Sequence, residues 1–169
     1  MPGPVHLYLV RHAVAEDRGP AWPDDALRPL TDDGAKRWRR QAAGLAAIDA
    51  RPDLILTSPY TRARQTADLL AAAFAKKPKV MELPALQPGA KPREVLRMLE
   101  PDPRRTSLAL VGHEPELGEL AAALVGFKTP PEFKKGAVAR IDVAILPPPA
   151  GSGALQWWLT PKILRALGK

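Results

Sequence analysis

The sequence predicts a three-layer α/β/α sandwich around a mainly parallel sheet. Short apolar runs rich in β-forming residues alternate with longer amphipathic patterns of helical period along most of the chain. The 169 residues are enough for one domain with a sizeable core and too few for two ordinary domains. No internal repeat interrupts the alternation, so a single domain is expected over residues 1–169.

Strands are expected where apolar residues run together without helical spacing. Residues 5–10 (VHLYLV) are almost wholly apolar, as in a parallel strand buried on both faces. Three further short runs share this character, at residues 54–56, 80–83 and 108–111. After Gly136 come two more strand-like runs, 137–146 and 155–159, and the segment 147–153 is expected to join them as a loop.

The first helix is expected to begin after Thr31, which is a good N-cap and is followed by two aspartates in the first turn. Trp38, Ala42 and Leu45 then recur at helical spacing on one side. The remaining helices are predicted from similar signals: one opened by Ser58 and Pro59 as N-cap and N1, and others at 93–99, 114–125 and 161–167. The Pro- and Asp-rich stretch 17–29 is interpreted as a surface loop.

Composition excludes several classes of protein. The absence of cysteine rules out disulfides, thiolate zinc sites and cysteine nucleophiles. No uninterrupted apolar run approaches the roughly 20 residues that span a bilayer. The N-terminal residues 1–4 lack the basic stretch and apolar core of a secretory signal. A cytoplasmic location without membrane attachment is therefore expected.

The net charge of +7 and the pI near 10.0 indicate attraction to phosphate-bearing partners. The cations are spread along the chain in short groups, at residues 36–40, 104–105, 134–135 and 162–169. With three Phe and two Tyr, the chain has few aromatic rings to stack on the bases of single-stranded nucleic acid. The charge is interpreted as general attraction of anions, without a specific nucleic-acid partner.

Candidate chemistry lies at three junctions between a strand and a helix. The first strand runs into Arg11 and His12, the second ends at Ser58 and delivers Arg62, and the fourth leads to His113. Since the carboxyl ends of strands line the ligand crevice of an open α/β sheet, these side chains should converge there beside a helix N-terminus. Taken singly, each histidine has a structural alternative and Arg62 could be a solvated helix charge. Three such junctions together favour a phosphate site that needs no metal.

The motifs at these junctions resemble the histidine phosphatase superfamily, also called phosphoglycerate-mutase-like. The resemblance rests on four runs, which are LVRHA at 9–13, PLT at 29–31, SPYTRARQTA at 58–67 and VGH at 111–113. The short length and the form GHEP at 112–115 are more similar to the SixA-type phosphohistidine phosphatases than to the mutases. One departure is Ala13, which stands where the family commonly has glycine and narrows the backbone freedom beside the nucleophile.

The resemblance implies that His12 is a nucleophile that carries the phosphoryl group. It also implies that Arg11, Arg62 and His113 bind the phosphoryl oxygens, and that neither cofactor nor metal takes part. The expected partner is a phosphorylated protein that carries phosphohistidine. Two alternatives stay open, namely a phosphatase for small phosphorylated substrates such as phosphomonoesters and a non-catalytic phosphate-binding module.

The general acid is left open by the sequence. Glu114 directly follows His113, in a place that resembles the acid of the acid-phosphatase branch. Its structural alternative is an acidic residue that suits the dipole at a helix start. Glu16, Asp17 and Glu82 are further candidates. Imidazole is a better leaving group than an alkoxide. Hydrolysis of phosphohistidine therefore depends less on a general acid to protonate the leaving group.

Overall fold

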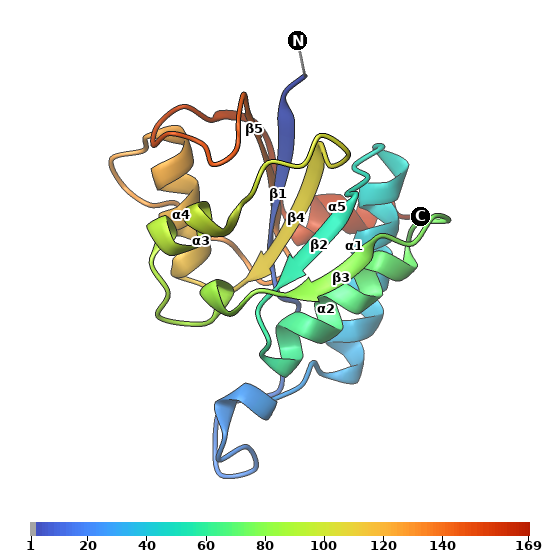
Figure 1. The fold of residues 1–169 in the computed structure, drawn as a ribbon. Coiled ribbons are helices and arrows are strands. Elements are labelled where there is room, and N and C mark those ends of the chain that lie inside the picture. Colours follow the sequence, from blue (N-terminus) through green and yellow to red (C-terminus); the bar gives the residue numbers. More distant parts are fainter. Residues whose placement is uncertain (1–2) are drawn as a thin grey trace.

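Six strands form one sheet in the computed structural model, which describes residues 3–169 (Figure 1). The order across the sheet is β3-β2-β4-β1-β5-β6. The strands are β1 (Val5–Arg11), β2 (Leu54–Thr57), β3 (Lys79–Glu82), β4 (Ser107–Gly112), β5 (Val138–Val143) and β6 (Ala154–Leu159). Residues 1 and 2 lie outside the described range. They belong to the N-terminal segment in which no secretory signal is expected.

The sheet is mainly parallel, as predicted. β1 pairs in parallel with β4, and β2 pairs in parallel with both β4 and β3. The two C-terminal strands run antiparallel, with β5 beside β1 and β6 beside β5. The three strands that end in the candidate site residues, β2, β4 and β1, are therefore direct neighbours in the middle of the sheet.

Helices cover both faces of the sheet and complete the three layers (Figure 1). One face packs against α1 (Asp32–Ala47), α2 (Thr61–Ala72) and α5 (Pro161–Leu167), and Trp38 lies fully buried between them. The other face packs against α3 (Pro92–Met98) and α4 (Glu116–Val125). Two short 3₁₀ helices, η1 (Asp25–Leu27) and η2 (Pro84–Leu86), lie in the connections. Within residues 3–169 no helix has the length and apolarity to cross a bilayer.

Two helix starts differ from the prediction. α2 begins at Thr61 with Tyr60 as its N-cap residue, so the N-cap role predicted for Ser58 is wrong. The Ser58 hydroxyl instead hydrogen-bonds a histidine at the candidate site. α4 begins at Glu116, two residues later than predicted, and ends as expected at Gly126, where φ is +88°.

The segment between β1 and α1 is more than the surface loop that its composition predicts. Much of it is exposed, and it projects from the end of the molecule where β1 finishes (Figure 1). Arg28, however, is only 6% exposed, and Asp25 opens the short helix η1. A bridge between Ala15 and Leu30 ties the two ends of the segment together, which holds it beside the candidate site.

Candidate active site

The predicted site residues meet at the carboxyl ends of three adjacent strands. The backbone N–H of His12 donates to the carbonyl of Gly112 at 3.0 Å, and that of Ser58 donates to Val111 at 3.0 Å. These hydrogen bonds extend the parallel pairing past the strand ends. The segments after β1, β2 and β4 are thereby held side by side, which brings together Arg11, His12, Arg62 and His113.

His12 is buried, and one hydrogen bond fixes its tautomer. Its Nδ1 lies 2.7 Å from the carbonyl oxygen of Ala13, which can only accept, so Nδ1 carries the proton. Nε2 makes no hydrogen bond with the residues that the structure describes. Burial lowers the pKa of His12 to about 3, and the charges of Arg62 and Arg11 act in the same direction. The ring is therefore neutral at physiological pH, with a free electron pair on Nε2.

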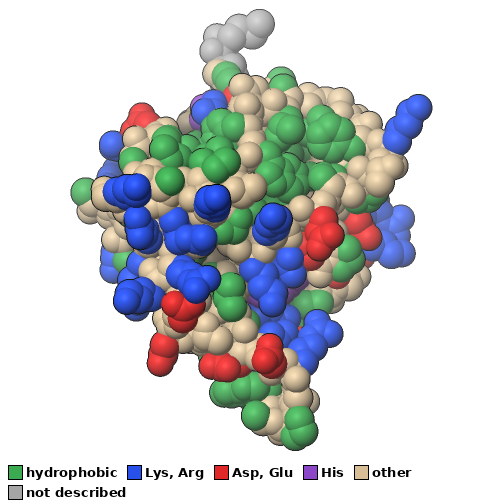
Figure 2. Space-filling model, turned by 180° about the vertical axis from the view of Figure 1, so that it is seen from behind, with side chains coloured by type: hydrophobic (Ala, Val, Ile, Leu, Met, Phe, Trp, Pro, Cys, Tyr) green, Lys and Arg blue, Asp and Glu red, His purple; other side chains and the backbone are tan. Residues whose placement is uncertain are grey.

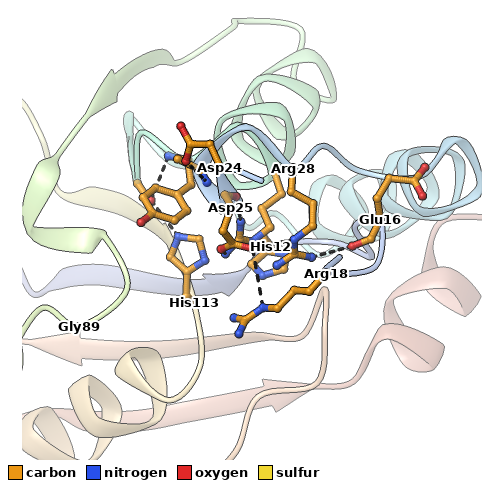
Figure 3. A network of polar contacts seen from close by, with 12 residues as sticks. His12, Glu16, Arg18, Asp24, Asp25, Arg28, Gly89 and His113 are labelled. Atoms are coloured by element: carbon orange, nitrogen blue, oxygen red, sulfur yellow. Dashed lines mark hydrogen bonds and ion pairs between the residues drawn. The ribbon is translucent and has the colours of Figure 1, made fainter. Parts of the chain in front are cut away.

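His113 faces His12 across the site, with 5.2 Å between the ring centroids (Figure 3). Its Nε2 lies within hydrogen-bond distance of the hydroxyl of Ser58, at 2.8 Å, and the backbone N–H of Tyr60 donates to that hydroxyl. Nδ1 is buried and has no partner in residues 3–169. Burial lowers the pKa of His113, and the neighbouring His12 and Arg62 lower it further.

Two arginines hold their guanidinium groups against the same site. Arg11 donates through Nη1 to the carbonyl of Phe133 at 2.6 Å. Arg62, only 2% exposed, donates through Nη1 to the carbonyl of Asp25 at 2.9 Å and through Nη2 to its carboxylate at 3.0 Å. In both arginines Nε is buried without a partner in the described chain.

Donors left buried without partners are costly, by about 1–3 kcal/mol each and more when charged. Only four side-chain atoms of the described residues are buried without a hydrogen-bond partner, and three are nitrogens of Arg11, Arg62 and His113. The fourth is an oxygen of Glu116. Such a concentration of unsatisfied nitrogens around one histidine fits an anion with several oxygens, such as a phosphoryl group.

Asp25 and Arg28 also belong to the site, and the sequence analysis missed both (Figure 3). The Asp25 carboxylate accepts from Arg28 Nε at 2.8 Å as well as from Arg62, and Arg18 Nε lies 3.7 Å from it. Desolvation acts to raise the pKa of Asp25, but the hydrogen bonds and charges of Arg28 and Arg62 outweigh it and hold this pKa below its usual value. Arg28 Nη1 donates to the carbonyl of Glu16 at 2.7 Å, which anchors the loop.

These residues surround a hollow of about 310 Å³. Its lining includes all the site residues proposed from the sequence, but not Asp25: Arg11, His12, Glu16, Asp17, Arg18, Arg28, Arg62, Pro88, His113, Glu114 and Lys135. A larger hollow of about 810 Å³ lies over β2 and β3. Among the described residues, its lining includes charged residues such as Glu82, Asp102 and Arg104 but no histidine, so the smaller hollow is the candidate site.

The four candidates for the general acid do not all lie at the site. Glu16, Asp17 and Glu114 line the hollow, whereas Glu82 lies on β3 and pairs with Arg64 at 3.5 Å. Glu114 Oε1 accepts from the backbone N–H of Gly118 at 3.0 Å, in the first turn of α4. Burial raises the pKa of Glu114, against the lowering effect of its hydrogen bonds and of Arg11. Glu114 therefore fits both interpretations. Its contact with Gly118 suits a structural role at the start of α4, and its raised pKa suits a general acid.

Ala13 is accommodated without strain beside the nucleophile. Asp49 is the only non-glycine residue of the described chain with positive φ, so position 13 does not need the freedom of glycine. The Ala13 methyl is buried in the core, and its N–H donates to the Thr66 hydroxyl at 3.1 Å. Thr66 in turn donates to the carbonyl of Arg62, which couples the two site segments.

No three His, Asp or Glu side chains in residues 3–169 come close enough to form a metal site. The imidazoles and guanidiniums described above are instead held by backbone carbonyls, by the Ser58 hydroxyl and by the Asp25 carboxylate.

Comparison with known proteins agrees with this geometry. The model of the histidine phosphatase superfamily (branch 1) matches residues 7–87, which contain Arg11, His12 and Arg62. An uncharacterized protein of Picosynechococcus is 40% identical over 126 residues, which cover 71% of this chain and 73% of that protein. The chain belongs to the histidine phosphatase superfamily.

Within the superfamily, this histidine phosphatase is similar to SixA. Phosphohistidine phosphatase SixA of Escherichia coli is 26% identical over 159 residues, or 93% of this chain and 94% of that protein. The structure of the protein histidine phosphatase SixA complexed with tungstate matches with a TM-score of 0.79 at 25% identity. That match covers 94% of this chain and 99% of the other. The predicted phosphoglycerate-mutase-like fold is confirmed, and the protein is a hydrolase of the histidine phosphatase family.

Proposed function

We propose that this histidine phosphatase removes phosphoryl groups from phosphohistidine on a partner protein, through an intermediate in which its own His12 is phosphorylated. The observation that carries the proposal is the set of buried, unpartnered nitrogens of Arg11, Arg62 and His113 around His12. Unpaired N–H donors of two guanidiniums that line one hollow, beside a neutral imidazole with a free nitrogen, suit a tetrahedral phosphoryl group attacked by that imidazole.

In the first step, His12 Nε2 attacks phosphorus in line with the leaving group. A bond forms between Nε2 and phosphorus while the bond between phosphorus and the substrate's imidazole nitrogen breaks. Charge on the transferring group is spread over its non-bridging oxygens, where Arg11 and Arg62 donate. The leaving imidazole takes a proton from solvent or from a carboxylic acid that lines the hollow.

In the second step, water attacks phosphorus and the bond to His12 Nε2 breaks. The products are inorganic phosphate and the original neutral histidine. His113 supports both steps: a bound dianion raises the pKa that burial lowers, so the ring can carry protons on both nitrogens. Nε2 then keeps its contact with Ser58 and Nδ1 donates to a phosphoryl oxygen.

Phosphohistidine is the favoured substrate because, among the described residues, the site holds no carboxyl group that is clearly positioned to protonate a leaving group. Glu82 does not line the hollow and pairs with Arg64, and one oxygen of Glu114 already accepts a hydrogen bond from Gly118. An imidazole needs less proton donation than an alkoxide. The similarity to SixA over nearly the full length supports the same substrate class.

Small phosphomonoesters are the second candidate. The specific observation in their favour is the raised pKa of Glu114 at the edge of the hollow, because a proton-carrying carboxyl could protonate an alkoxide.

The mechanism is tested by trapping the intermediate. Brief incubation with phosphoramidate, followed by an alkaline quench, is expected to leave phosphate on His12. A His12→Ala variant should fold and show essentially no label and no turnover. Substantial residual turnover in that variant would rule out His12 as the nucleophile.

The substrate is tested by a panel on the wild-type protein. A phosphohistidine peptide, a sugar phosphate and an aryl phosphate are compared by kcat/KM, with and without EDTA. The peptide is expected to be the best substrate, and the chelator should change nothing. A preference for the sugar phosphate would support the second candidate, and binding of all three without turnover would indicate a phosphate-binding module.

A further inference from the structure

Six cations lie on the turn before β5, on α1, and on and just after α5. We call this set the basic band, and it consists of Arg40, Lys134, Lys135, Lys162, Arg165 and Lys169. Figure 2 shows Lys and Arg side chains gathered over part of the molecule seen from behind, with acidic side chains among them and along its lower edge.

The band is connected to the nucleophile by specific contacts. Lys135 lines the hollow that contains His12, and the next residue, Gly136, donates its N–H toward the carbonyls of Arg11 and His12. The carbonyl of Gly136 accepts from Gln41 of α1 at 2.9 Å. Gln41 then accepts from Arg165 of α5 at 3.2 Å. These contacts place Arg165 of α5 one side chain away from the turn that carries Lys134 and Lys135.

The charge of the band is not neutralised by the protein itself. None of its six side chains forms an ion pair with an acidic residue within positions 3–169. Most arginines outside the band are paired, such as Arg62 and Arg28 with Asp25, or Arg140 with Asp142. Within residues 3–169, Arg39, Arg93, Arg97 and the lysines outside the band also have no ion pair. Uncompensated charge on one face steers partners of opposite charge toward it.

We propose that the basic band docks an acidic surface of the phosphorylated partner protein, beside the phosphohistidine that enters the hollow. This inference rests on the proposed function, because the band begins at Lys135 in the hollow lining. A protein partner is favoured over nucleic acid because the band offers no aromatic platform. Trp38 of α1 is fully buried, and α5 contains no aromatic residue.

The inference is tested with two phosphohistidine peptides that differ only in a flanking run of glutamates or lysines. Free phosphohistidine is the third substrate and reports on the hollow alone. The test variant is Lys134→Glu with Lys162→Glu, both exposed and neither part of the hollow lining. The matched control is Lys76→Glu with Lys77→Glu, the same change of charge beyond the end of α2 and away from the site.

For the wild type, kcat/KM is expected to be about tenfold or more higher for the glutamate-flanked peptide than for the lysine-flanked one. This preference should shrink as NaCl is raised to about 0.5 M, because salt screens surface charge. The test variant should lose most of the preference and keep its turnover of free phosphohistidine. The control variant should behave like the wild type.

Two results would overturn the docking surface. The first is equal kcat/KM for the two peptides in the wild type, or equal loss in both variants. The second is tight binding of a single-stranded DNA oligonucleotide or of anionic lipid vesicles that the test variant loses, with no peptide preference. Failure to hydrolyse free phosphohistidine would instead contradict the proposed function, so the two failures are distinguishable.

Discussion

At the scale of single residues, the hydrogen bond from His12 Nδ1 to the carbonyl of Ala13 determines which ring nitrogen can react. A histidine that donates through one nitrogen presents the other as a nucleophile without losing a proton first. The nearby cations and the burial of the ring keep it neutral. The nucleophile is thus prepared by position and tautomer, and it does not need a separate base to activate it.

Glu114 is the residue whose role a substitution can decide. Glu114→Gln preserves size and hydrogen bonding but removes the transferable proton. If Glu114 is the general acid, hydrolysis of an alkyl phosphate should fall by about 10²–10⁴-fold and that of phosphohistidine much less, because the loss scales with the basicity of the leaving group. An aryl phosphate should fall between them.

The same assay also tests whether Glu114 only stabilises the start of α4. An equal, small loss for all three substrates would assign it to its contact with Gly118 at the start of α4, worth about 0.3–1 kcal/mol through the helix dipole. The search for the acid would then move to Glu16 and Asp17, which share the hollow.

At the scale of structural elements, the turn before β5 holds the nucleophile segment in place. Gly136 has φ of +80°, and its N–H contacts the carbonyls of Arg11 and His12. A Cβ at this position would collide with the Gln41 side chain of α1. The backbone under the nucleophile therefore depends on glycine here.

Gly136→Ala is expected to destabilise the fold by about 2–4 kcal/mol, from the left-handed backbone and the overpacking together. The control is Gly89→Ala, which has φ of +87° but no atom within 4 Å of the added Cβ. It should cost only about 1–2 kcal/mol. Chemical denaturation measures both, and equal effects would show that the contact with Gln41 is unimportant.

The elements were largely predictable because their signals are local. The apolar run of β1, the Thr31 cap of α1 and the glycine after α4 were all identified from neighbouring residues, and the structure confirms them. Ser58 was misassigned because a serine that caps a helix and one that binds a distant histidine have the same local sequence. Asp25 was missed for a related reason: its ion pair with Arg62 spans 37 positions, and the surrounding Pro- and Asp-rich composition is typical of a loop.

At the scale of the whole molecule, the site places two histidines and two arginines at the edge of the core. His12 and His113 are 5% and 3% exposed, and burial lowers the pKa of both. In the unfolded chain each histidine has a pKa of about 6.5. Between that value and the folded pKa, which is about 3 for His12, the unfolded state binds more protons.

The free energy of unfolding is therefore expected to fall as pH decreases below about 6.5, by up to ~1.4 kcal/mol per pH unit for each buried histidine. Denaturant titrations at pH 7, 6 and 5, in buffer without phosphate, measure this slope. His12→Asn should reduce the loss between pH 6 and 5 by about 1 kcal/mol. An unchanged slope in the variant would mean that His12 is not held neutral by the fold.

The carboxylate of Asp25 leaves Arg62 able to bind an anion without giving up its ion pair. Arg62 Nη2 carries two hydrogens, of which Asp25 Oδ2 accepts one, and Nε has no partner in the described chain. The Nε–H and the second Nη2–H together form a fork that fits two oxygens of a phosphoryl group. Asp25, itself held by Arg28, therefore fixes the guanidinium before the phosphoryl group arrives and after phosphate departs. Little side-chain entropy is lost on binding, so the site is ready for each new substrate without rearrangement.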